Sequence, residues 1–74
     1  MTSSQQEVDD LMHARAHVAR SEELVQEQRT RVAELERDGH DATAAKDLLE
    51  TLEQSLAVMH EHLAIEEKLV RPTG

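Results

Sequence analysis

The sequence predicts an all-α fold, an antiparallel two-helix hairpin of the coiled-coil-like kind that forms a single domain over residues 1–74. Apolar residues recur at spacings of three and four along two long stretches, which is the period of an amphipathic helix. One interruption, Asp38-Gly39-His40-Asp41, separates the stretches, and the other glycine and the only proline lie in the last three residues. A break of this size is sufficient to reverse the chain between two helices.

The first helix is expected from about residue 4 to about residue 38. Gly39 adopts the left-handed conformation readily and therefore ends it, and the turn covers residues 38–41. Asp41 is a residue type preferred at helix starts, so the second helix is expected from about residue 42 to about residue 70. Pro72 follows shortly after, and proline disfavours helix in the residue before it.

A seven-residue repeat, with positions labelled a to g, identifies the face that each helix turns toward the other. The a and d positions of the first helix are Leu11, Val18, Val25 and Val32, and Ala14, Ser21, Gln28 and Leu35. Those of the second are Ala42, Leu49, Leu56, Leu63 and Val70, and Ala45, Leu52, Met59 and Glu66. We expect these rows to form the seam of the hairpin, in which Gln28 either fixes the register or lies at the edge in water.

The second helix carries a further row at its g and c positions, which we call the outer row. Its members are Leu48, Thr51, Ser55, Val58, His62, Ile65 and Leu69. Seam and outer row together span about 160° of the helix, more than one slender helix covers. We therefore expect the outer row to be an interface, most simply with a second copy in a dimeric four-helix bundle. The direction in which the hairpins pack, and whether helices swap between copies, stay open at this point.

Composition excludes several classes of functional site. The chain has 74 residues, no aromatic residue and no cysteine, so disulfides, zinc–thiolate sites and thiol nucleophiles are excluded. A chain this small buries a limited core, which favours assembly. The net charge of −8 repels nucleic acid. No apolar run is long enough to span a membrane and no export signal is apparent, so we expect residence in the cytoplasm.

Five histidines are the one chemical oddity of the sequence. Folding the chain about the turn places His17 near His62 and His13 near Glu66. These four side chains, His13, His17, His62 and Glu66, could hold a divalent transition metal, or the imidazoles could make an interface sensitive to pH. The alternative, which we favour, is a set of solvated histidines with no metal and no cofactor.

No catalytic site is expected. A hydroxyl nucleophile would be Ser21 or Ser55, and neither has a glycine nearby to form an oxyanion site. Two helices also lack the cleft that a pair of catalytic carboxylates requires.

The residues around the turn carry one resemblance. The segment Leu35-Glu36-Arg37-Asp38-Gly39-His40-Asp41-Ala42 is followed by Ala45-Lys46-Asp47-Leu48-Leu49 and Leu52-Glu53. This pattern resembles a group of short, uncharacterised helical-hairpin proteins of alphaproteobacteria, over about residues 17–63. The resemblance implies a bacterial origin and supplies no catalytic residue, cofactor or substrate.

The sequence thus predicts a non-enzymatic interaction or regulatory module that self-associates through its second helix. One alternative is an adaptor that docks Leu48, Val58, Ile65 and Leu69 on a different protein. The other is the histidine-based metal or pH-responsive binder.

Overall fold

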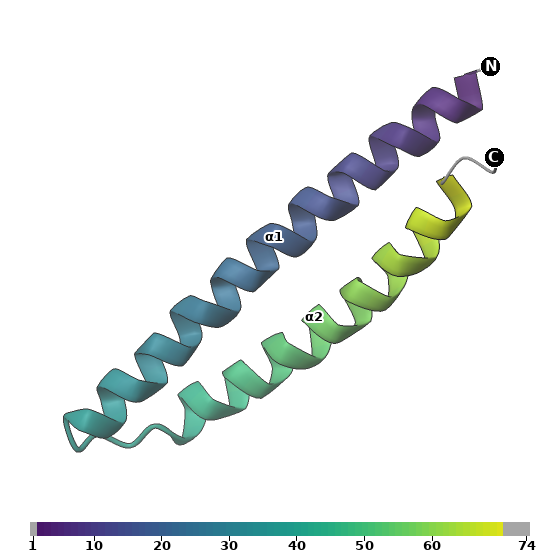
Figure 1. Ribbon diagram of the computed structural model, residues 1–74. Helices are drawn as coiled ribbons and strands as arrows, with labels where there is room; N and C mark the ends of the chain where they lie inside the picture. The colour runs from purple at the N-terminus through teal and green to yellow at the C-terminus, as the bar shows by residue number, and fades with distance from the viewer. Residues whose placement is uncertain (1, 71–74) are drawn as a thin grey trace.

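Two antiparallel helices make up the molecule: α1 spans Thr2–Arg37 and α2 spans Thr43–Val70. The computed structural model describes the backbone of residues 2–70 and the side chains of residues 5–69. The helices lie side by side, so that the start of α1 and the end of α2 share one end of the molecule and the turn forms the other (Figure 1). The predicted all-α hairpin is confirmed.

The molecule is a rod of about 58 × 18 × 15 Å with a radius of gyration of 17.0 Å. A spherical domain of this length would have a radius of gyration of about 11 Å. Two helices in contact along their lengths bury only the stripe between them. Among the described side chains, accordingly, no large one is completely enclosed.

The end of α1 is a Schellman motif, the hydrogen-bonded cap expected when a glycine takes the left-handed conformation. Gly39 has φ +76°, its amide donates to the carbonyl of Glu36, and the amide of His40 donates to that of Leu35. These bonds satisfy carbonyl groups that the last turn of α1 would otherwise leave unpaired. The prediction that Gly39 ends the first helix is confirmed.

The start of α2 is fixed by Asp41, which lies just before the helix. One oxygen of its carboxylate accepts hydrogen bonds from the backbone amide of Thr43, at 2.9 Å, and from the Thr43 hydroxyl, at 2.7 Å. These bonds lower the pKa of Asp41, with the side-chain bond as the main cause. Asp41 therefore caps α2 as predicted, although helical structure begins two residues later, at Thr43.

Of the two outer helix boundaries, one differs slightly from the prediction and one agrees with it. Helix α1 begins at Thr2 rather than near residue 4, because extending an existing helix by two residues costs little and Thr and Ser tolerate it. The end of α2 at Val70 agrees with the prediction. The tail, residues 71–74, lies outside the described residues.

The heptad seam is confirmed. The a positions of α1 are buried, namely Leu11, Val18, Val25 and Val32, and its d positions are half-buried. On α2, Ala42 is buried, and the other described a and d positions are half-buried. The core is therefore a single line of aliphatic side chains between the two helices.

Candidate functional site

The two flanks of the seam are chemically different, and this difference defines the candidate site. One flank is formed by the e positions of both helices. The other is formed by the g positions, which on α2 belong to the outer row.

Three ion pairs and one histidine–carboxylate contact close the e flank. They join Arg15 to Glu67, Glu22 to His60, Arg29 to Glu53, and Glu36 to Lys46. Their closest N–O distances are 3.0, 3.3, 2.8 and 2.6 Å in the same order. Each pair lies seven residues further along α1 and seven residues back along α2 than the one before. We call this arrangement the ion-pair ladder.

Details of the ladder show how its members are held. Nε and one terminal nitrogen of Arg15 both donate to a single oxygen of Glu67. The hydrogen bond from Lys46 to Glu36 raises the pKa of Lys46, and the attraction between their charges adds to this effect. All these groups remain accessible to water, so the pairs are screened and each contributes little to stability. The ladder acts mainly by fixing register and direction.

The ladder was missed by the heptad interpretation, which considered apolar rows only. A signal was present: the e positions of α1 read Arg15, Glu22, Arg29 and Glu36, which alternate in sign. The e positions of α2 read Lys46, Glu53, His60 and Glu67 and complement that series when the chain direction is reversed.

The g flank has no such closure. Among residues 5–69, every ion pair that joins the two helices belongs to the e flank. All seven outer-row residues are exposed in the single chain. The exposed fractions of the aliphatic members are 49% for Leu48, 50% for Val58, 56% for Ile65 and 77% for Leu69. The residues predicted as an interface thus form an uncovered strip along α2.

A shallow hollow lies at the middle of this strip. It is lined by Thr51, Gln54, Ser55, Val58 and Met59. Thr51 and Ser55 are short side chains that separate Val58 from Leu48, so the surface is lower here than at either end of the outer row.

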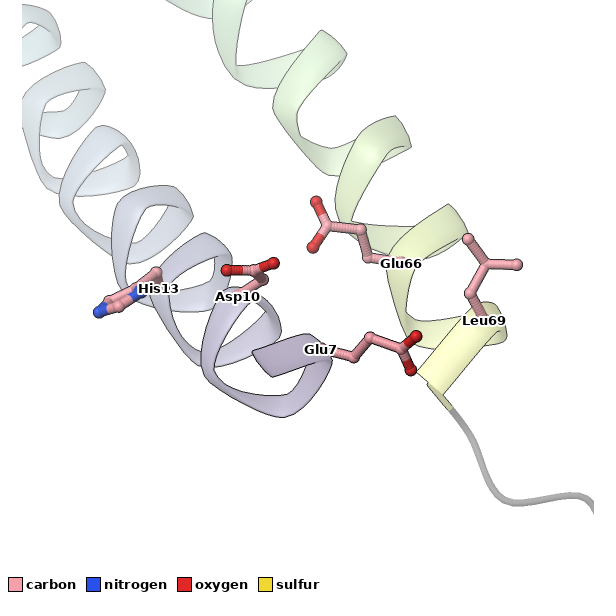
Figure 2. A pocket seen from close by; sticks show the side chains of 5 residues that line it. All are labelled: Glu7, Asp10, His13, Glu66 and Leu69. Carbon is pink, nitrogen blue, oxygen red and sulfur yellow. The ribbon is translucent and has the colours of Figure 1, made fainter. Parts of the chain in front are cut away.

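The predicted histidine cluster comes together only in part. His17, His62 and Glu66 line one small hollow beside the seam, as the folding arithmetic anticipates. His13 and Glu66 line a larger groove at the open end of the hairpin, together with Glu7, Asp10 and Leu69. There the His13 ring points away from the Glu66 carboxylate (Figure 2).

No group of three or more His, Asp or Glu side chains in the described part of the chain is placed to hold a metal ion. In the open-end groove, Glu7 and Asp10 of α1 face Glu66 of α2 across the gap (Figure 2). This is an acidic surface beside Leu69, and the imidazole of His13 is not directed toward its carboxylates (Figure 2). The cluster His13, His17, His62 and Glu66 is therefore not assembled as a metal site in this structure.

Neither helix, over its described residues, carries an apolar stretch long enough to cross a membrane. Comparison with protein-family models, with curated proteins and with solved structures finds no match to the chain. The resemblance of the turn segment to alphaproteobacterial hairpins therefore stays an expectation from the sequence, and the outer row of α2 is the candidate functional site.

Proposed function

We propose that the protein is a non-enzymatic protein–protein interaction module that self-associates through the outer row of α2 into a four-helix bundle. The observation that carries this proposal is the exposure of Leu48, Val58, Ile65 and Leu69 along one strip, while the opposite flank is closed by ion pairs. Residence in the bacterial cytoplasm is part of the proposal and rests on the sequence.

Physical reasoning supports an association surface. A fully buried aliphatic side chain is about 1.5 to 3 kcal/mol more favourable than an exposed one. The four outer-row aliphatics are each about half exposed or more, so a partner that covers them recovers a large part of that free energy. The hairpin has little core of its own, and assembly is the usual means of stabilising so small a chain.

Substitution of Ile65 by glutamate tests the proposal. Ile65→Glu places a charge in the strip and should give a monomer at concentrations where the unmodified chain is dimeric, with helix content partly retained in far-UV circular dichroism. Met12→Glu is the matched control, because Met12 is equally exposed, at 61%, but lies on α1 away from the strip. It should leave the dimer intact.

Sedimentation velocity of the three chains over a range of concentrations provides the measurement. An Ile65→Glu chain that dimerises as well as the unmodified chain would contradict the proposal. A monomeric unmodified chain would favour docking of the same strip on a different protein.

A further inference from the structure

The outer row is spaced nearly symmetrically about Val58, with the short side chains of Thr51 and Ser55 on one side and larger side chains on the other. Leu48 and Leu69 lie ten and eleven residues away from it, Thr51 and Ile65 lie seven away, and Ser55 and His62 lie three and four away. A strip with this pattern is complementary to itself when one copy is reversed. The geometry points to a second copy of this chain as its occupant, with the two α2 helices antiparallel and a two-fold axis at Val58. This inference rests on the proposed function and specifies its interface.

The hairpin itself supplies the template for such a pairing. Within one chain, residues of one heptad row meet the same row of the antiparallel helix, as the four e–e pairs of the ladder show. The same geometry, applied to two α2 helices about Val58, brings each Leu48 beside the other copy's Leu69. It also brings Ser55 beside His62 and places the two Val58 side chains against each other.

Charge complementarity fixes the direction. The row next to the outer row on α2, at the f positions, reads Asp47, Gln54, Glu61 and Lys68. In the antiparallel dimer, Asp47 of each copy lies beside Lys68 of the other, so two ion pairs form, one at each end. Within a single chain, neither Asp47 nor Lys68 takes part in any of the ion pairs seen among residues 5–69. Both are therefore available to a second copy.

The parallel arrangement loses these ion pairs. In a parallel pair of helices, the row on one flank of the interface faces the opposite flank of the other helix, as e faces g in a parallel coiled coil, so Asp47 does not meet Lys68.

The hollow at the middle of the strip is a second, independent observation. It is centred on the short side chains Thr51 and Ser55 next to Val58. With the two-fold axis at Val58, Ile65 and His62 of the second copy lie against Thr51 and Ser55, so two larger side chains cover the hollow that these short ones leave.

Cysteine cross-linking tests the arrangement without interference, because the chain has no cysteine of its own. Under mild oxidation, Val58→Cys should form a disulfide-linked dimer. Leu48→Cys alone should not, since its counterpart lies about 31 Å away along the helix axis, far beyond disulfide reach. An equimolar mixture of Leu48→Cys and Leu69→Cys chains should form the mixed disulfide. Leu48→Cys that links readily to itself would overturn the antiparallel arrangement.

Exchange of the end charges gives a second readout that does not depend on oxidation. Asp47→Lys and Lys68→Asp should each weaken dimerisation about tenfold, because each replaces two attractions by two repulsions. The double variant Asp47→Lys/Lys68→Asp should recover most of the lost affinity. A double variant as weak as either single variant would overturn the pairing.

The outcomes separate the two proposals. A chain that sediments as a monomer at every concentration removes the proposed self-association and this interface with it. A dimer in which Leu48→Cys links to itself leaves the proposed function standing and removes only the two-fold axis at Val58.

Discussion

Gln28 reaches across the seam and donates a hydrogen bond from its side-chain amide to the backbone carbonyl of Ala45, at 3.0 Å. Ala45 lies in the first turn of α2, where its small side chain leaves the carbonyl within reach of the other helix. The bond joins residues that are 17 positions apart and is half-buried. Gln28 therefore makes a specific contact in the register of the hairpin, in agreement with the first of the two roles considered for it.

Replacement of Gln28 by alanine should lower the free energy of unfolding by about 1 kcal/mol, the usual net contribution of one such hydrogen bond. Gln26→Ala is the matched control, because Gln26 is exposed on the outer face of α1 and should change stability little. Urea unfolding of the two variants measures the difference. Equal stability of the two would show that the bond to Ala45 contributes nothing to the hairpin.

Val25 is the most enclosed side chain of the seam, with 3% of its surface exposed. Val25→Ala removes two buried carbon atoms and leaves a space between the helices, so it should cost about 2 kcal/mol of stability. Val8→Ala, on the same helix but 41% exposed, should cost less than half as much. Thermal unfolding followed by circular dichroism compares the two losses of stability. A larger loss in Val8→Ala than in Val25→Ala would contradict the position of the core at the seam.

Arg29 and Glu53 form the closest arginine–carboxylate pair of the ladder, at 2.8 Å. A double-mutant cycle of Arg29→Ala and Glu53→Ala should give a coupling free energy of about 0.2 to 1 kcal/mol, because both groups are half exposed to water. The coupling should shrink in 1 M salt, where charges are screened within about 3 Å. The cycle of Arg31→Ala with Glu53→Ala is the control and should give no coupling. An equally large coupling free energy in the control cycle would show that the interaction is not specific to the Arg29–Glu53 pair.

The cap formed by Asp41 should make the stability of the folded chain fall as the pH is lowered. Its pKa is lowered in the folded chain by the bonds from Thr43, so the ionised carboxylate is the form that stabilises α2. This contribution is fully present above the ordinary value of 3.8 and is lost as the pH falls through the lower pKa of the folded chain. Lowering the pH below about 4 should therefore reduce the melting temperature more in the unmodified chain than in Asp41→Asn. Identical acid slopes in the two chains would contradict the cap.

Much of this fold follows from local sequence. Gly39 and Asp41 specify the turn because each acts on its own backbone or on the adjacent one, and the residues at a positions are buried because a seven-residue period determines a helix face. The same heptad arithmetic correctly placed His17 near His62. It also correctly predicted that α1 of the same chain leaves the outer row uncovered.

Other features depend on side-chain direction and could not be obtained from spacing. His13 shares a groove with Glu66, yet its ring turns away from that carboxylate, and position in a heptad does not determine this choice of rotamer (Figure 2). The bond from Gln28 to a backbone carbonyl likewise depends on a side-chain conformation that spacing does not determine. The ladder, by contrast, was available from the alternating charges of Arg15, Glu22 and Arg29 and their partners, once the e rows of both helices were compared.

Sedimentation equilibrium of the unmodified chain, from low micromolar to near-millimolar concentration, tests the central claim most directly. The account predicts a reversible rise in mass from the single-chain value of 8.4 kDa to twice that value, where it should level off because a two-fold pairing is closed. A mass that stays at 8.4 kDa over the whole range, with the helices intact, would contradict it.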